Sequence, residues 1–238
     1  MKVWAHRGCS QNYPENTLVA FKKAIELQNL TGIELDVQLT KDGYPVVIHD
    51  ERVDRVTEGI GYIRDYTLAE LKRLNIYPEQ KIPTIEEVLD LLEGRLKNGM
   101  KLNIELKNSK YPYEGMEEKI VKIIGDRKLE KSIVYSSFYA ASIEKLKRME
   151  VPSELAILDN KVSDCLYKLR GGCGAEALHP FWKGMDLKKD QLEGMVVRAY
   201  MGGHLYPEKS TGNKLNFAEL EEQGITDIIL NEPEVYVE

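Results

Sequence analysis

Hydrophobic and polar positions alternate between two patterns along the chain. Short runs rich in Ile, Val and Leu are separated by longer stretches in which apolar residues recur every three or four positions. The short runs predict strands and the longer stretches predict helices, an order typical of a parallel sheet covered by helices. Eight strands of this kind favour a closed (β/α)8 TIM barrel. They are expected at residues 2–6, 32–39, 101–106, 132–136, 154–158, 175–178, 195–200 and 226–230.

Several of the helices between these strands carry recognisable start signals. One apolar stripe begins at Leu18, after Asn16-Thr17, which we interpret as the helix caps. Capping boxes begin at Thr67 and Thr84, each with a glutamate three residues later. Further helices are expected at about 114–126, 140–149, 162–170 and 215–223.

One stretch interrupts the alternation. Residues 38–49 read as strand, turn and strand, because Asp42-Gly43 between two apolar runs is a strong hairpin signal. The residues that follow, up to the helix near Thr67, show neither period. We interpret about 40–83 as a small insertion after the second barrel strand, where barrels commonly elaborate the mouth of the active site. Residues 1–238 are otherwise expected to form a single TIM-barrel domain.

Composition narrows the class of protein. The 238 residues are 42% hydrophobic, enough for a substantial core, and 30% charged with a formal net charge of −6. This acidic balance argues against nucleic-acid binding and against stable membrane association. No apolar leader follows Met1-Lys2 and no apolar stretch reaches membrane-spanning length, so a cytoplasmic protein is expected. An anionic substrate would need a local positive site.

The three cysteines point to no zinc or disulfide chemistry. Cys9, Cys165 and Cys173 form no CxxC pair, and their odd number leaves no complete disulfide framework. Cys9 lies three residues after His6, and a cysteine beside a histidine can act as a nucleophile. No orienting partner is evident in the sequence, so we interpret Cys9 as a bystander on the loop.

Groups suited to acid/base chemistry, metal binding and anion binding lie at or inside four apolar runs. Alternate side chains of a strand point to the same face, so carboxylates two residues apart project together. If the strands are neighbours, these groups converge at the carboxyl ends of the strands, where (β/α)8 barrels hold their active sites. The four segments are His6-Arg7-Gly8, Glu34-Leu35-Asp36, His49-Asp50 and Glu105-Leu106-Lys107.

Three of these groups are carboxylates on strands that a barrel would enclose: Glu34, Asp36 and Glu105. A solvated strand face is the ordinary explanation for an isolated pair of acids. Inside a barrel, however, buried carboxylates repel one another and are poorly solvated unless a cation neutralises them. Oxygen ligands of this kind suit Mg²⁺ or Ca²⁺ better than zinc. Lys107 is either the ion-pair partner of Glu105 or a contact to a phosphate.

Two of the four histidines, His6 and His49, end strand-like runs beside polar groups. Each alone could be an ordinary structural or surface histidine, but two at strand ends make an acid/base pair credible. Arg7 offers a planar fork for bidentate phosphate binding. His179 and His204 have no charged partner at strand spacing, and for them we expect structural or substrate-proximal roles near the barrel mouth.

These motifs, in their order along most of the chain, resemble the glycerophosphodiester phosphodiesterase family. The family implies a (β/α)8 barrel with a small insertion after the second strand, which agrees with the excursion at 40–83. The resemblance rests on His6-Arg7-Gly8, Pro14-Glu15-Asn16-Thr17, Glu34-Leu35-Asp36-Val37, Lys41-Asp42-Gly43, Val47-Ile48-His49-Asp50, the segment Ile82 to Leu89, Ile104-Glu105-Leu106-Lys107 and Ser136-Ser137-Phe138.

The resemblance implies a reaction and a role for each site residue. The expected reaction is metal-dependent hydrolysis of glycerophosphodiesters, which are deacylated phospholipids, to glycerol 3-phosphate and an alcohol. In the family the glycerol 2-hydroxyl attacks first and gives a cyclic phosphate that water then opens. The partner is a small-molecule phosphodiester, and a homodimer is compatible with the sequence. The implied roles are a Ca²⁺ or Mg²⁺ site at Glu34, Asp36 and Glu105, an acid/base pair at His6 and His49, phosphate binding at Arg7 and Lys107, and support from Glu15.

The C-terminal third departs from the family's pattern in two segments. Val197-Arg198-Ala199-Tyr200-Met201 stands where the family carries a Trp-Thr-Val-Asn-like segment whose aromatic ring helps form the glycerol pocket. Leu230-Asn231-Glu232-Pro233 replaces an ending similar to Thr-Asp-x-Pro. Our hypothesis is that an inward-pointing Arg198 favours a more anionic head group. Two alternatives stay open: a module that binds a phosphorylated metabolite without turning it over, and a related phosphodiesterase acting on lysophospholipids.

Overall fold

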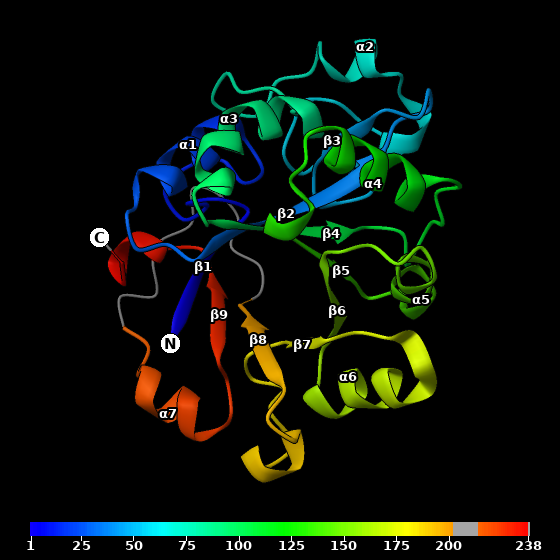
Figure 1. Cartoon of the computed structure of the whole chain (residues 1–238). Coiled ribbons are helices and arrows are strands. Elements are labelled where there is room, and N and C mark those ends of the chain that lie inside the picture. Colours follow the sequence, from blue (N-terminus) through cyan, green and yellow to red (C-terminus); the bar gives the residue numbers. More distant parts are fainter. Residues whose placement is uncertain (202–213, 238) are drawn as a thin grey trace.

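Eight parallel strands close into a barrel in the computed structural model, which describes residues 1–201 and 214–237 (Figure 1). Each strand pairs in parallel with its neighbours, and β1 pairs with both β9 and β2 to close the ring. The (β/α)8 barrel expected from the hydrophobic pattern is confirmed. The barrel strands are β1 (Lys2–His6), β2 (Gly32–Leu39), β4 (Lys101–Leu106), β5 (Ile133–Ser137), β6 (Glu154–Asp159), β7 (Ala177–Pro180), β8 (Val196–Tyr200) and β9 (Asp227–Leu230).

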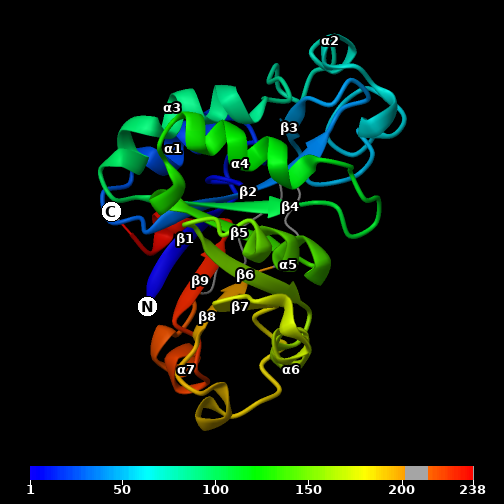
Figure 2. The ribbon, with the colours of Figure 1, turned by 45° about the vertical axis from the view of Figure 1, so that its right-hand side comes forward.

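Helices cover the outside of the barrel. Figure 2 shows α1, α3 and α4 above the strands and α6 and α7 below them. Among residues 1–201 and 214–237, none of the helices combines the length and the apolar character needed to cross a membrane. The helices are α1 (Leu18–Glu26), α2 (Leu68–Leu71), α3 (Ile85–Lys97), α4 (Met116–Asp126), α5 (Ala140–Arg148), α6 (Val162–Lys168) and α7 (Phe217–Glu222).

The capping signals at Thr17, Thr67 and Thr84 are confirmed, but the one at Asn16 is not. Thr67 and Thr84 both form complete capping boxes, with Glu70 and Glu87 respectively. Thr17 caps α1 by accepting from the backbone N–H of Ala20. The expectation that Asn16 shares this capping role is wrong.

Alternate side chains of the barrel strands divide between two hydrophobic clusters. Outward-facing residues such as Val3 and Ile33 pack against the helices, while Trp4 lies inside the barrel. All eight residues of β2 are buried, because one face meets helices and the other meets the barrel interior. Glu34 and Asp36 therefore lie inside the barrel. The interior cluster comprises Trp4, Val134, Ala156, Ala177 and Ile229.

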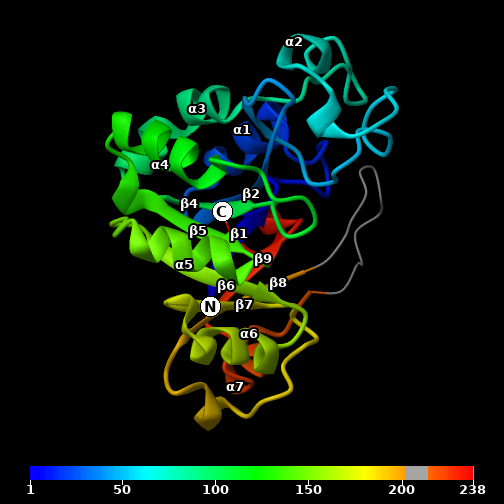
Figure 3. The ribbon, with the colours of Figure 1, turned by 90° about the vertical axis from the view of Figure 1, so that its right-hand side faces the viewer.

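The segment between β2 and α3 stands out from the ring of helices, with α2 near its tip (Figure 3). It begins as a hairpin, because β3 (Pro45–Val47) pairs antiparallel with the end of β2. His49 lies two residues after Val47, the last residue of β3. The segment has a small hydrophobic cluster of its own, formed by Val46, Ile48, Val53, Ile63, Leu71, Ile76 and Ile82.

Arg198 does not line the mouth of the barrel, which corrects the hypothesis that it selects a head group. It lies level with Asp227, the first residue of β9, to which its Nε donates at 3.3 Å. Its Nη1 donates to Glu154 at 3.0 Å, and its guanidinium carbon lies 4.2 Å from the ring centre of Trp4. The residue borders a cavity of about 410 Å³ at the amino ends of the strands. Its charge is therefore paired at the end of the barrel away from the strand termini that carry His6.

His179 lies fully buried inside the barrel rather than at its rim. Its Nε2 is 2.8 Å from Nη1 of Arg198, and because a guanidinium only donates, Nε2 is the acceptor. This charged neighbour comes from another strand, so spacing within one strand could not reveal it. His204 lies outside the described residues.

His179 should make the protein less stable in acid. Burial, and then the charge of Arg198, lower its pKa well below the ordinary value of 6.5. As pH falls below about 6.5 the unfolded chain takes up a proton that the folded protein does not, so the free energy of unfolding falls. When the pH is lowered from about 7.5 to about 5, the free energy of unfolding of the parent should fall by up to about 2 kcal/mol more than that of His179→Asn. Urea unfolding at both pH values measures this, and equal losses in the two proteins would contradict it.

Candidate active site

The polar groups at the strand ends meet at one mouth of the barrel. The register pairs Asp36 with Glu105 across β2 and β4, and His6 with Glu34 across β1 and β2. Glu34, Asp36 and Glu105 are buried, and each offers a carboxylate oxygen within 4.8 Å of the others. The structure therefore brings together the three acids that the strand spacing indicated.

A buried arginine and a largely buried lysine accompany the three acids. The Nη1 atom of Arg7 lies 2.9 Å from Glu15, and its Nε lies 3.2 Å from Asp36. Nζ of Lys107 lies 3.0 Å from Glu105 and 3.8 Å from Asp36. Burial opposes the charge of Arg7, but Asp36 and Glu15 outweigh it and the pKa of Arg7 is raised. For Lys107, burial is likewise outweighed by Glu105 and Asp36, and its pKa is raised. Both side chains stay charged.

The carboxylates differ in how well the protein compensates their charge. Burial, followed by the charges of Asp36 and Glu105, raises the pKa of Glu34 well above its usual range. Burial also acts against the charge of Asp36, but Arg7 and His49 outweigh it, so the pKa of Asp36 is lowered. Among the described residues Oδ1 of Asp36 has no hydrogen-bond partner. A divalent cation between these oxygens would supply the missing compensation, so the donor set fits a hard metal ion.

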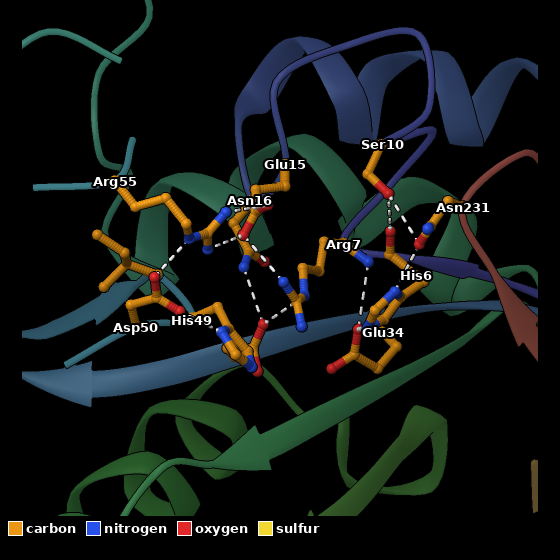
Figure 4. Close-up of polar contacts among 12 residues, drawn as sticks. His6, Arg7, Ser10, Glu15, Asn16, Glu34, His49, Asp50, Arg55 and Asn231 are labelled. Carbon is orange, nitrogen blue, oxygen red and sulfur yellow. Dashed lines mark hydrogen bonds and ion pairs between the residues drawn. The ribbon is translucent and has the colours of Figure 1, made fainter. Parts of the chain in front are cut away.

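His6, at the end of β1, contacts Asn231 through one ring nitrogen and faces Glu34 with the other (Figure 4). Its Nδ1 lies 2.6 Å from Oδ1 of Asn231, and its Nε2 lies 3.8 Å from Glu34. Burial, and then the charge of Arg7, lower the pKa of His6 from 6.5 to about 3. The ring is therefore neutral at neutral pH and presents Nε2 on the side of the acids.

His49 faces the same mouth from the segment after β3, on the opposite side of Arg7 from His6 (Figure 4). Its Nδ1 lies 2.6 Å from Asp50, which also accepts from Nε of Arg55. Burial acts against the charge of Asp50, but these hydrogen bonds outweigh it and its pKa is lowered. Arg55 donates two further bonds to Glu15, at 2.8 and 2.7 Å. The pair Arg55 and Glu15 thus links the second histidine to Arg7.

Four residues that complete the arrangement were missed by the sequence reasoning. Nε2 of Gln38 lies within hydrogen-bond distance of the backbone oxygens of 48, 49 and 50, at 3.1, 3.1 and 2.6 Å, and so fixes the loop of His49. It follows Asp36 by two residues on the same face of β2, so the strand period could have found it. Asn16 donates to Asp36 at 2.9 Å. Asn16, Arg55 and Asn231 come from loops or from distant sequence, where no period indicates a contact.

The turn after β1 needs its glycine. Gly8 has φ of +84°, and a Cβ there would lie 2.7 Å from the backbone carbon of Ala20. Only glycine fits both the conformation and the space. The turn carries Arg7, whose backbone N–H donates to the backbone oxygen of Glu34 at 2.9 Å.

Cys9 takes no part in this constellation. Its side chain is buried, and burial, followed by the charge of Glu234, raises the pKa of its thiol. A buried thiol whose pKa is raised is a poor nucleophile. The geometry agrees with a bystander role.

Aromatic rings stand at the ends of β5, β7 and β8. Tyr200 makes an edge contact with Phe138, at 6.1 Å between ring centres, and a tilted contact with Phe181 at 5.7 Å. Burial and then the charge of Glu105 raise the pKa of Tyr200. Within the atypical segment of β8 it is therefore Tyr200, rather than Arg198, that lies toward the acids.

A parallel (β/α)8 barrel whose mouth joins buried carboxylates, two hydrogen-bonded histidines and two cations is suited to a hydrolase acting on phosphate esters. The sequence profile of the Glycerophosphoryl diester phosphodiesterase family matches residues 6–163. A glycerophosphodiester phosphodiesterase from Caldanaerobacter subterraneus subsp. tengcongensis is 36% identical over 99% of this chain and 96% of its own length. The chain therefore belongs to the glycerophosphodiester phosphodiesterase family and is a phosphoric diester hydrolase.

Two further relatives agree in fold and sequence. A glycerophosphodiester phosphodiesterase from Bacillus altitudinis is 40% identical over 82% of this chain and 81% of its own length. A phosphodiesterase from Oleispira antarctica, solved in complex with the product sn-glycerol-3-phosphate, has a TM-score of 0.77 at 26% identity. That superposition covers 99% of this chain and 94% of the Oleispira chain.

Proposed function

We propose that the enzyme is metal-dependent and hydrolyses glycerophosphodiesters to glycerol 3-phosphate and an alcohol, with His6 and His49 as its acid/base pair. The observation that carries this proposal is the meeting of both histidines with Arg7 and three buried carboxylates in one barrel mouth. The Oleispira structure adds support, because a protein of similar fold binds glycerol 3-phosphate as its product.

The metal ion that we propose is Ca²⁺ or Mg²⁺, held by Glu34, Asp36 and Glu105. Their oxygens are close enough for one ion, and both Asp36 Oδ1 and the Glu34 carboxyl lack full compensation from the protein. When bound, the ion would withdraw electron density from the phosphoryl oxygens and offset their negative charge.

Arg7 and Lys107 would bind the phosphate beside these acids. A phosphodiester resists hydrolysis because its negative charge repels nucleophiles and its alkoxide leaving group is poor. The planar guanidinium of Arg7 can contact two phosphoryl oxygens, and Glu15 holds it at 2.9 Å while Arg55 neutralises the remaining charge of Glu15. Glu15 therefore orients Arg7, and because Arg55 offsets the charge of Glu15, Arg7 can still attract the phosphate.

The two histidines would move protons on opposite sides of the phosphorus. As the glycerol 2-hydroxyl forms its bond to phosphorus, its proton passes to Nε2 of neutral His6. As the bond to the alcohol breaks, His49 in its protonated form gives a proton to the departing oxygen, and Asp50 stabilises the ring. Water then opens the cyclic phosphate with the two roles reversed, which regenerates both histidines.

Chelation should abolish turnover. With excess EDTA the release of glycerol 3-phosphate from glycerophosphocholine or glycerophosphoethanolamine should stop, because the three carboxylates would repel the phosphate once no cation offsets them. Adding Mg²⁺ or Ca²⁺ should restore it, and the better ion identifies the cofactor. Normal turnover in excess EDTA would refute the metal role.

The same assay, run on acylated as well as deacylated substrates, separates the remaining alternatives. A module that only binds a phosphorylated metabolite would release no glycerol 3-phosphate under any metal. A lysophospholipid phosphodiesterase would prefer acylated over deacylated substrates. We expect the deacylated compounds to be the better substrates.

A further inference from the structure

Asn231 contacts Nδ1 of the His6 ring, the nitrogen on the side away from Glu34. It directly follows β9, its side chain is buried, and its Oδ1 lies 2.6 Å from Nδ1 of His6. Its backbone oxygen accepts from the N–H of Gln11 at 2.9 Å, which ties the end of β9 to the loop after β1. The contact therefore comes from the last strand of the barrel to the first.

Ser10 completes a small network around this contact (Figure 4). Its hydroxyl donates to the backbone oxygen of His6 at 2.7 Å and lies 3.2 Å from Oδ1 of Asn231. The backbone and the ring of His6 are thus fixed together by groups that touch none of the three acids. In this arrangement the carboxamide oxygen of Asn231 serves as an acceptor.

We propose that Asn231 is a positioning residue that holds the His6 ring in place and keeps its proton on Nδ1. A neutral imidazole carries one N–H, and an acceptor at Nδ1 places it there and leaves the lone pair on Nε2. Nε2 is the atom that faces Glu34, at 3.8 Å, and so the mouth of the barrel. The inference rests on the proposed role of His6.

The two histidines have different partners behind their rings. Asp50, behind His49, is a carboxylate, whereas Asn231 is a neutral amide. An amide orients the ring of His6 without adding a charge to a pocket that already contains Arg7 and Glu34. His6 is thus prepared to accept a proton from the start of the reaction.

Two variants of Asn231 test the direction of this hydrogen bond, and a third variant is their control. Asn231→Leu removes the acceptor at similar volume, and kcat should fall about 10- to 100-fold while KM changes less than about 3-fold. Asn231→Asp restores an acceptor that cannot donate, and kcat should recover to within about 5-fold of the parent. Asn98→Leu, at the exposed end of α3, is the matched control and should leave kcat unchanged.

Nitrogen-15 NMR of histidine-labelled protein with Mg²⁺ reads the tautomer directly. The His6 resonances are assigned by their loss in His6→Gln, and they should show Nδ1 protonated in the parent and in Asn231→Asp, and lose this preference in Asn231→Leu. Protonation at Nε2 in the parent, an unchanged kcat in Asn231→Leu, or an aspartate variant as impaired as the leucine variant would each overturn the proposal. The parent spectrum decides even if the leucine variant does not fold or if the parent hydrolyses no glycerophosphodiester.

Discussion

Replacing Asp36 with alanine should lower turnover of a glycerophosphodiester at least about a thousand-fold. Asp36 is a proposed metal ligand and also contacts Arg7 at 3.2 Å and Lys107 at 3.8 Å. Its loss removes one of three carboxylates from the proposed cation site and also removes the ion pair between Asp36 and Arg7. Metal binding and phosphate orientation would fail together.

Steady-state kinetics at saturating Mg²⁺ and Ca²⁺, with calorimetric metal titration, measure this effect. Asp36→Asn keeps the shape of the side chain, so a loss of metal affinity in that variant reports charge rather than misfolding. Asp126→Ala, at the exposed end of α4, is the control. Parent-like kcat in both Asp36 variants would show that this carboxylate is not needed for turnover.

Removing either histidine should lower kcat by about two to four orders of magnitude. His6→Gln takes away the proton acceptor, and His49→Gln takes away the donor to the leaving alcohol. Because both act in one proton circuit, the double variant should be little worse than the slower single variant. Thermal unfolding of each variant checks that the substitution has left the fold intact.

A substrate with an activated leaving group separates the two roles. The p-nitrophenyl diester of glycerol 3-phosphate keeps the attacking 2-hydroxyl but needs no proton on its departing oxygen. The activity of His49→Gln on this substrate should therefore be much closer to that of the parent. His6→Gln should stay impaired, because the attacking hydroxyl still has to lose its proton. Near parental rates in both single variants would contradict the assignment, and recovery of His6→Gln alone would exchange the roles.

The barrel and part of its site follow from the strand period alone. An alternation of two residues places Glu34 and Asp36 on one face, and the closure of eight strands encloses that face. The same period puts Arg198 inside the barrel but says nothing about its height along the axis. That height is set by the register between β8 and β9, which aligns Arg198 with Asp227. The sequence of one strand does not contain this information.

Contacts between loops that are distant in the chain could not be predicted from the sequence either. Asn16 looked like a helix cap because asparagine is a common cap, yet its side chain donates to Asp36. Arg55 contacts Glu15 across 40 residues of the chain, and Asn231 contacts His6 across 225 residues. Local propensity cannot indicate such pairs.

The ion pair between Glu15 and Arg55 should limit how these two positions change in evolution. The segment that bears His49 has an apolar cluster separate from that of the barrel, so its surface can change among descendants without repacking the strands. Glu15 and Arg55 belong to different sides of that division, and each neutralises the other in a partly buried contact. A recombinant gene could take the barrel from one parent and the segment between β2 and α3 from a divergent one. Such a protein would keep both apolar clusters but could lose the ion pair, so we expect Glu15 and Arg55 to be replaced together.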